Sequence, residues 1–464
     1  MIFTSISFLA FFLIIYSIYW LLPSYRSKKI CLLFASMFFY ASWNLGFFLH
    51  FLLMIVMNYW IVLHVYRTGA KKYLVLAVVL NLINLGFFKY FYFFTEIVSD
   101  ISGLPLLQSL KSSSFKIILP LAISFYTFQI LAFTVDVYRK KFQQEIGLFD
   151  YTVFIMFFPQ LIAGPIMRPE DFIPQLKGEE KLSLDSQYKG MFLIGVGVIK
   201  KVLIADNLAF IIDPIWVKPE DYSGLTCLLA FHAFSWQIYC DFSGYTDIAR
   251  GVAFLLGYQI PENFKAPFLA TSPSECWQRW HITLSSWMRD YIYIPLGGSR
   301  VAEARHHFNT IVTFTLGGLW HGASWNFVIW GFYHGCILSV ERLGKKFSLD
   351  KILPLSSSKF FGWLFTYHIF IWGAGIFRTS SMGDFLIMAK AIFANTPGKV
   401  VLTETVGYLC FFALLLQIIE YKNRKLTLPM QKIKVILMPL AYLLLIFLVG
   451  LLGVGSKEFV YFQF

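Results

Sequence analysis

The sequence predicts an all-α, polytopic membrane protein, because its composition and its long apolar runs both suit a lipid environment. Of the 464 residues, 58% are hydrophobic and only 14% are charged, whereas about 25% of the residues of an ordinary soluble domain are charged. Runs such as 5–22, 73–94 and 435–453 approach or exceed the roughly 18 residues of a spanning helix. We therefore expect about 11 transmembrane helices plus re-entrant helices.

The first apolar run, 5–22, has the features of a retained span rather than those of a cleavable signal. No Lys or Arg precedes it, and Leu21-Leu22-Pro23 is a poor cleavage site. The six cysteines are scattered through apolar segments without a C-x-x-C pair. We interpret them as small core residues, and we expect neither a disulfide framework nor a metal site.

The basic residues indicate how the spans are oriented. The formal net charge is +13, which could suggest nucleic-acid binding, but the Lys and Arg residues form short clusters between apolar runs, as in cytoplasmic loops. The clusters are Arg26/Lys28/Lys29, Arg67/Lys71/Lys72, Arg139/Lys140/Lys141, Lys345/Lys346 and Lys422/Arg424/Lys425. We therefore expect membrane lipids and no nucleic acid as partners. A secondary attraction for an anionic cytosolic donor stays open.

The N-terminal third can be threaded through the membrane with these clusters in the cytoplasm. The N-terminus is then outside, and 30–66 folds as two short spans around Asn44-Leu45-Gly46. The run 73–94 crosses outward, and 115–137 returns to the cluster at 139–141.

The middle of the chain is harder to thread. Segment 151–165 is too short to cross comfortably, so we expect it to be re-entrant. Segment 308–340 is long for one span and short for two, and we expect Gly317-Gly318 to interrupt it. We expect a single domain over 1–464, made of N-terminal spans 1–140, a core 141–345, C-terminal spans 346–453 and an extracytoplasmic tail 454–464.

Polar and ionisable residues at membrane depth are costly, so clusters of them are candidate functional sites. The first cluster, 237–250, carries Asp241, Ser243, Tyr245, Asp247 and Arg250. Asp241 and Tyr245 stand four residues apart and share one helix face. A buried hydrogen-bonded network that fixes helix packing explains this cluster as simply as a binding site does.

The second polar cluster begins with a helix start. Ser272, Pro273 and Glu275 read as a capping box with Ser272 as the N-cap. The helix that follows is expected to carry an aromatic face from Trp277 to Trp287. That face holds Trp277, Trp280, His281, Leu284 and Trp287. A cleft near the lipid–water boundary and simple interfacial anchoring both fit this pattern.

Further along, His321 lies in an apolar segment between Gly317-Gly318 and Gly322. The glycines allow another backbone or a ligand to approach closely. A lone histidine on an apolar helix is usually a hydrogen-bonded core residue. Imidazole is nevertheless the side chain best suited to accept a proton near neutral pH, so His321 is a candidate general base.

On these residues the chain resembles the membrane-bound O-acyltransferase family, most closely its bacterial branch of alginate and peptidoglycan O-acetyltransferase membrane subunits. The matching strings are LPLAISFYTFQILAFTVDVYR (119–139), LIAGPIMRPEDFIPQL (161–176), YCDFSGYTDIARG (239–251), WHITLSSWMRDYIYIPLGGSR (280–300), GGLWHGASWNFVIWG (317–331) and the terminal YFQF. They follow the family's order over most of the chain. YIYIPLGGSR favours the O-acetyl branch over the related D-alanyl branch of teichoic acid modification, which stays the alternative.

The resemblance implies roles for individual residues. His321 corresponds to the family's nearly universal catalytic histidine, and His281 to a second histidine of the bacterial branch, either as catalytic support or as a structural hydrogen bond. The terminal string resembles a C-terminal tyrosine motif of related acyl-transfer systems, so Tyr461 is expected to carry the acyl group, unless it is an aromatic anchor. The residues expected to bind substrate are Trp320, Asn326, Arg289, Asp290, Trp280 and Arg300.

The resemblance also implies a reaction. The donor is expected to be cytosolic acetyl-CoA, with no permanently bound cofactor, in a protein of the bacterial cytoplasmic (inner) membrane with a central cavity. The acetyl group would cross to an extracytoplasmic glycan such as peptidoglycan or an alginate-like exopolysaccharide. Because the chain has no G-x-S-x-G elbow, an extracytoplasmic partner with a Ser-His-Asp site is expected. A transporter is a weaker alternative, since the sequence shows no inverted repeats.

Overall fold

The computed structural model describes residues 2–103, 117–178, 182–347, 358–401, 403–423 and 431–455. Helices make up this described part of the chain, together with an isolated β-bridge between Tyr222 and Lys399. The chain forms two compact units. Unit 1 comprises Met1–Gln187 with Val252–Pro261, and unit 2 comprises Tyr188–Gly251 with Glu262–Phe464.

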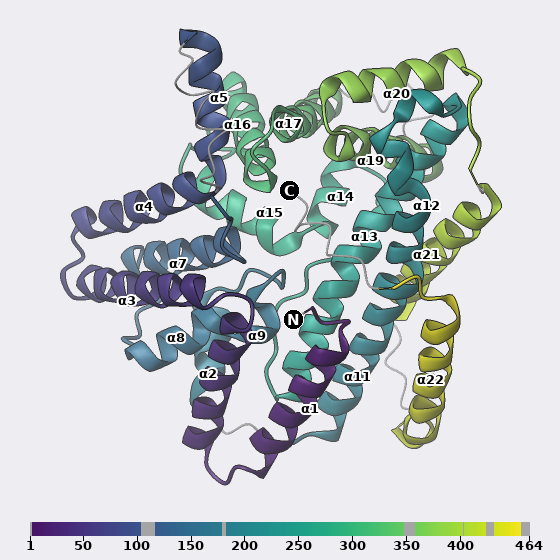
Figure 1. Cartoon of the computed structure of the whole chain (residues 1–464). Helices are drawn as coiled ribbons and strands as arrows, with labels where there is room; N and C mark the ends of the chain where they lie inside the picture. Colours follow the sequence, from purple (N-terminus) through teal and green to yellow (C-terminus); the bar gives the residue numbers. More distant parts are fainter. Residues whose placement is uncertain are drawn as a thin grey trace. The chain divides into compact units, whose positions relative to one another are not determined.

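Figure 1 shows the helices in their order along the chain. The first half holds α1 (Ile6–Leu21), α2 (Tyr25–Ala41), α3 (Leu45–Thr68), α4 (Lys71–Leu85), α5 (Phe91–Ser102), α7 (Ile123–Tyr138), α8 (Leu148–Met156), α9 (Phe158–Leu161), α10 (Pro169–Phe172) and α11 (Leu184–Val198). The second half holds α12 (Asp206–Val217), α13 (Gly224–Leu255), α14 (Pro273–Arg279), α15 (Ile282–Met288), α16 (Glu303–His321), α17 (Trp325–Lys346), α19 (Lys359–Arg378), α20 (Met382–Ala394), α21 (Thr403–Asn423) and α22 (Gln431–Leu452).

Several of these helices are long and apolar enough to cross a membrane. Among the described residues, four meet both criteria: Leu45–Thr68, Lys71–Ser102, Lys359–Arg378 and Glu404–Lys422. Three shorter helices, Ile6–Leu21, Ile123–Tyr138 and Met438–Leu452, are also apolar. The all-helical prediction is confirmed, and these lengths fit a polytopic membrane protein. The expected number of about 11 spans stays a prediction.

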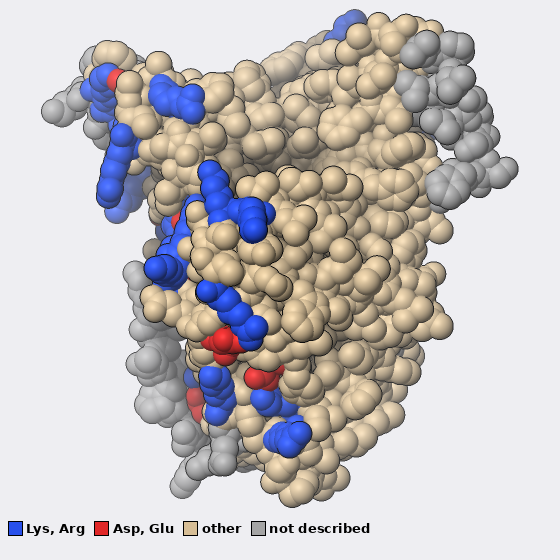
Figure 2. All heavy atoms as spheres, turned by 90° about the vertical axis from the view of Figure 1, so that its left-hand side faces the viewer, with Lys and Arg blue, Asp and Glu red and all other residues tan. Residues whose placement is uncertain are grey.

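Two basic clusters of unit 1 form salt bridges with acidic residues of the segment 145–150. Lys29, in the first turn of α2, pairs with Asp150 at 2.7 Å, and Arg67, in the last turn of α3, pairs with Glu145 at 3.0 Å. Figure 2 shows Lys and Arg gathered along one part of a face that is otherwise almost free of charge. Large apolar side chains such as Leu53, Trp60 and Ile83 are exposed on these helices. This separation of charge from apolar surface is what a cytoplasmic end and a lipid-facing side require.

The segment expected to be re-entrant forms two short helices. α8 and α9 are separated at Phe157, and both are buried within unit 1. Whether this segment enters and leaves the membrane on one side stays a prediction.

In unit 2, α16 and α17 form a tightly packed helical hairpin (Figure 1). α16 runs without a break through Gly317-Gly318, so the prediction that these glycines interrupt the segment is wrong. Gly318 instead lets the two backbones touch, since a Cβ atom there would lie 2.0 Å from the carbonyl oxygen of Phe327. The turn between the helices falls at Gly322–Ser324.

Buried ion pairs join α13 to the π-helical turn Ile199–Ala205 and to α21. Lys200 and Lys201 lie in this turn and are only 2% and 1% exposed. The pairs are Lys201–Asp206 (2.6 Å), Lys201–Asp241 (2.7 Å), Lys200–Asp247 (2.8 Å) and Lys200–Glu420. Removing one partner of such a pair leaves an uncompensated buried charge. The aspartates of the cluster at 237–250, Asp241 and Asp247, therefore belong to a network of ion pairs between helices.

The hairpin generates a stability prediction. Gly318→Ala places a methyl group against the Phe327 carbonyl and is expected to destabilise the protein by about 1–3 kcal/mol. The neighbouring Gly317→Ala is the control, because its Cβ would meet only the Met288 Cε atom at 3.9 Å. It is expected to be neutral or slightly stabilising, since Ala suits a helix better than Gly. Thermal unfolding of the purified protein in detergent distinguishes the two variants. Equal changes in their unfolding temperatures would contradict the packing argument.

Candidate active site

The helix expected after Ser272 is broken at Trp280 and His281. α14 ends at Arg279 and α15 begins at Ile282, with His281 between them at a φ of 44°. A positive φ is uncommon for a residue with a side chain and persists only where the surroundings enforce it. The expectation of one continuous aromatic face from Trp277 to Trp287 is therefore wrong.

The start of α14 agrees with the sequence prediction only in part. The Ser272 hydroxyl accepts a hydrogen bond from the Glu275 backbone N–H at 3.2 Å, and Pro273 occupies the first helical position. The Glu275 carboxylate accepts from the backbone N–H and the hydroxyl of Thr271, at 2.7 and 3.0 Å, rather than from Ser272. Ser272 is confirmed as the N-cap, and the reciprocal half of the capping box is wrong.

Asn263, distant in sequence, holds the turn at His281. Its backbone carbonyl accepts from Ile282 N at 2.9 Å. Its side-chain Oδ1 accepts from Thr283 N at 3.1 Å and from Thr283 Oγ1 at 3.0 Å. The Nδ1 atom of His281 lies 3.3 Å from the same Oδ1. Four contacts to one residue thus stabilise the positive φ and the break between α14 and α15.

The same contacts fix the tautomer of His281. Because a backbone N–H can only donate, the Thr283 amide identifies the facing Asn263 atom as oxygen. An oxygen acceptor requires His281 Nδ1 to carry the proton, so Nε2 keeps its lone pair. Nε2 has no hydrogen-bond partner among the described residues, although His281 is only 1% exposed. His281 is therefore set to accept a hydrogen bond at Nε2.

His321 is the last residue of α16 and is 6% exposed. Its ring is enclosed by other rings, with centroids 4.9 Å from Trp320, 5.1 Å from Trp330 and 5.3 Å from Phe377. The ring of His281 lies 6.4 Å away. The structure therefore brings together the two histidines that the sequence proposed.

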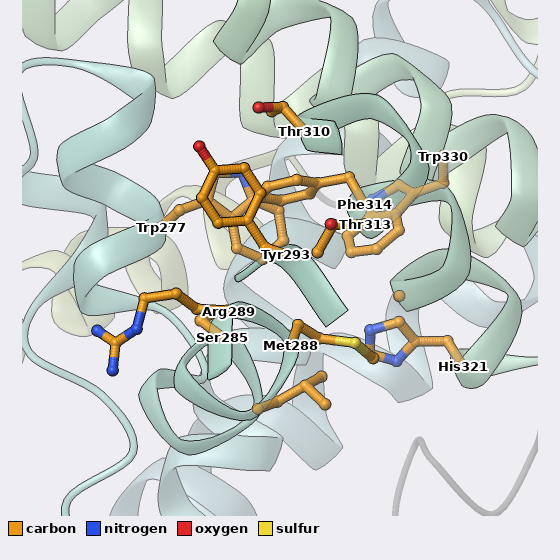
Figure 3. A pocket seen from close by; sticks show the side chains of 12 residues that line it. Trp277, Ser285, Met288, Arg289, Tyr293, Thr310, Thr313, Phe314, His321 and Trp330 are labelled. Atoms are coloured by element: carbon orange, nitrogen blue, oxygen red, sulfur yellow. The ribbon is translucent and has the colours of Figure 1, made fainter. Parts of the chain in front are cut away.

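Two cavities adjoin His321, and the larger is about 230 Å³ in volume (Figure 3). Its lining comes from α14–α17 and the turn after α15: Trp277, Leu284, Ser285, Met288, Arg289, Tyr293, Thr310, Thr313, Phe314, Gly317, His321 and Trp330. In Figure 3 the His321 ring lies beside Met288, and the Arg289 guanidinium points away from it on the other side of the cavity. The cavity thus has an aromatic interior and a cationic group at its edge.

The smaller cavity, of about 30 Å³, lies against other elements of unit 2. Its lining comes from α13, α17, α19 and the segment 268–280: Ser235, Ile238, Phe268, Trp280, His321, Trp330, His334, Phe370, Ala374 and Phe377. His321 and Trp330 line both cavities. These two rings therefore form a partition between a larger and a smaller space.

The residues expected to bind substrate divide into two groups. Trp280 lines the small cavity, Arg289 lines the large one, and Trp320 packs against both histidine rings. Asn326, Asp290 and Arg300 are not among the lining residues of either cavity. Asn326 Nδ2 donates to the Thr379 carbonyl at 2.7 Å and to its hydroxyl at 3.2 Å, and Asp290 accepts from Arg289 at 2.7 and 3.1 Å. Arg300 is exposed, and Tyr461 lies outside the described residues.

Sequence reasoning missed Asn263 and His334. His334 is 1% exposed, lies on α17 and packs at 5.0 Å from the Trp330 ring. Its spacing of four residues from Trp330 on one helix could have indicated that both rings face the same space. Asn263 carries no such signal, because its partners are distant in the sequence.

Comparison with known proteins shows which family the chain resembles. The sequence profile described as MBOAT, membrane-bound O-acyltransferase family, matches residues 139–372. The "Probable alginate O-acetylase AlgI" of Pseudomonas aeruginosa is 36% identical over 89% of this chain and 82% of that protein. The "Peptidoglycan O-acetyltransferase" of Helicobacter pylori is 34% identical over 81% of this chain and 76% of that protein. The "Teichoic acid D-alanyltransferase" of Bacillus subtilis is 30% identical over 55% of this chain and 68% of that protein.

The matched residues include both histidines, Asn263 and the whole lining of the large cavity. The profile alone covers half of the chain, and the O-acetyltransferase relatives cover most of it. This chain therefore belongs to the membrane-bound O-acyltransferase family.

Proposed function

We propose that this acyltransferase takes an acetyl group from acetyl-CoA and passes it across the membrane for O-acetylation of an extracytoplasmic glycan. The observation that carries the proposal is the place of His321 in the partition between two cavities. A base in that position can act on a reacting carbonyl that lies between the two spaces. The names of the relatives point to alginate-like polysaccharide or peptidoglycan as the class of acceptor.

The chemistry requires one proton transfer at His321. The acceptor hydroxyl oxygen attacks the thioester carbonyl carbon, so that a C–O bond forms and the C–S bond breaks. His321 takes the hydroxyl proton and delivers it to the sulfur, which gives an ester and the CoA thiol without another co-reactant. The oxyanion that develops on the acyl carbonyl oxygen needs a hydrogen-bond donor in the wall of the site.

His281 is proposed as a positioning residue for this proton transfer. The His281 ring does not line either cavity, but it lies 6.4 Å from the His321 ring. The Nε2 lone pair, fixed by Asn263, would act on His321 through the packed rings that separate the two imidazoles, which include Trp320.

The tail supplies the proposed acyl carrier. Transfer from thioester to the Tyr461 phenol and then to a sugar hydroxyl runs from better to poorer leaving groups, because a phenol has a pKa of about 10. The tyrosyl ester would be handed to an extracytoplasmic partner with a Ser-His-Asp site. The proposed location is the bacterial cytoplasmic membrane, in keeping with the bacterial relatives.

The D-alanyl reaction is the second candidate. The D-alanyltransferase relative aligns with 55% of this chain, against 89% for the O-acetylase, so the acetyl reaction is favoured. A transporter would move its substrate without consuming acyl-CoA. Release of free CoA therefore separates both acyl-transfer reactions from transport.

His321→Ala is expected to lower the release of CoA from acetyl-CoA by about 10²–10⁴-fold, because the proton acceptor is lost. The control is His368→Ala, which removes an exposed histidine of α19 whose Nδ1 bonds only locally, to the Leu364 carbonyl. CoA thiol is measured in membranes that contain the full chain and its partner proteins. Undiminished release by His321→Ala would exclude this residue as the base.

Asn263→Ala is expected to lower the rate about 10- to 100-fold, the range seen when a partner that orients a functional histidine is removed. Thr283→Val is the matched control, because it removes a hydroxyl bonded to the same Asn263 oxygen and leaves the bond to His281. Asn263→Asp keeps an acceptor oxygen and is expected to retain more activity than Asn263→Ala. If Thr283→Val is as damaging as Asn263→Ala, the residue acts through the local fold and not through the His281 tautomer.

Tyr461→Phe is expected to abolish acetylation of the glycan, because the phenol oxygen that accepts the acetyl group is missing. Intact mass of the wild-type protein after brief exposure to acetyl-CoA should rise by one acetyl group, and that of the variant should not. Tyr408→Phe, at an exposed tyrosine of α21, controls for the loss of a hydroxyl. Full acetylation of the glycan by Tyr461→Phe would end the carrier hypothesis.

A further inference from the structure

We infer that the small cavity beside His321 is the acyl subsite of the enzyme and that its size restricts the donor to an acetyl group. This inference rests on the proposed function, and it adds which residues set the length of the acyl chain. The residues that carry it are Ile238 on α13, His334 on α17, and Phe370 and Ala374 on α19.

The position of the cavity meets the geometric requirement. A transferred acyl group must place its carbonyl carbon next to the base and its alkyl end in a space beyond it. His321 and Trp330 are shared by the two cavities, with ring centroids 5.1 Å apart. A thioester whose longer arm lies in the large cavity therefore reaches the small cavity at His321.

The volume of the cavity sets the length of the acyl chain. One water-sized group needs about 10–15 Å³, so the small cavity of about 30 Å³ holds two such groups. Beyond its carbonyl carbon, an acetyl group must place two such groups, the methyl group and the carbonyl oxygen. A propionyl group must place three. The large cavity, at about 230 Å³, imposes no such limit.

The walls of the small cavity are rigid. Phe370 packs against His334 with ring centroids 5.0 Å apart and against Trp277 at 5.6 Å. The His334 ring in turn fills the space left by Gly373, where a Cβ atom would lie 2.6 Å from Nε2. A close-packed aromatic wall of this kind cannot yield to an added methylene without strain.

His334 also provides polarity suited to a carbonyl group. Its Nδ1 is buried without a hydrogen-bond partner among the described residues. The nearby Ser235 hydroxyl already donates to the Phe231 carbonyl at 2.9 Å, so its proton is not available to the ligand. The imidazole N–H of His334 is therefore the donor that we assign to the acyl carbonyl oxygen, beside the indole N–H groups of Trp280 and Trp330 in the same lining.

The test is a competition between two donors. Membranes that contain the full chain and its partner proteins are given equimolar acetyl-CoA and propionyl-CoA, and the two glycan esters are quantified by mass spectrometry. Wild-type enzyme is expected to prefer acetyl by about 10- to 200-fold, the range that one methylene commands in a tight pocket. Phe370→Leu and Ala374→Gly are expected to reduce this preference about tenfold, and Ala374→Val to lower acetyl transfer itself.

The control is Leu284→Ala, which enlarges the large cavity and is expected to leave the preference unchanged. Because the ratio is measured within one mixture, it does not depend on how much of a variant folds. If Phe370→Leu is inactive, Ala374→Gly still shows whether this wall sets the preference for acetyl, because it is a smaller change in the same wall. A wild-type enzyme that uses both donors equally, or variants that keep the wild-type preference, would overturn the inference. No ester from acetyl-CoA in wild type would instead contradict the proposed function.

Discussion

The active site depends on the close contact between α16 and α17. Gly318 allows the two backbones to touch, and the contact fixes where α16 ends, which is at His321. The same pair of helices supplies Trp330, the other ring shared by both cavities. A side chain at position 318 would push α17 away from α16 and would change the partition, the large cavity and the His334 wall together. His321, the proposed base, is thus positioned by backbone packing, which is stiffer than a side-chain contact alone.

A second constraint is that polar groups in apolar surroundings must find partners within the protein. Lys200 and Lys201 satisfy it with carboxylates from α12, α13 and α21, which fastens these helices around one π-helical turn. The side-chain oxygen of Asn263 satisfies it with three donors. That oxygen in turn decides which nitrogen of His281 bears the proton. A requirement of folding therefore also sets the protonation of a residue that we propose to assist the reaction.

The sequence predicted what depends on local patterns, and it failed where distant residues decide. The apolar runs correctly predicted the helices on both sides of Asn44. The Ser272 N-cap was predicted from the residues that follow it. The break at His281 was missed because Asn263, which enforces it, is remote in the chain. Gly317-Gly318 was misread as a break because glycine permits both a kink and a close helix contact, and only the partner helix distinguishes them. His281 and His321 were singled out by their surroundings and received roles from the family resemblance, whereas the lining of the two cavities, which depends on side-chain packing, could not be predicted from the sequence.

The chemistry explains why a largely aromatic site with a few polar groups can suffice. A thioester is already activated, so the protein must mainly exclude water, hold the carbonyl beside a base and move one proton. The rings around His321 enclose it, and in the proposed reaction the two cavities hold the donor on both sides of its carbonyl carbon. A small alkyl group is hard to hold by attraction alone, because one methyl group offers little surface. A space that admits acetyl and excludes anything longer is therefore the more effective means of selection, and the rigid wall of α19 provides it.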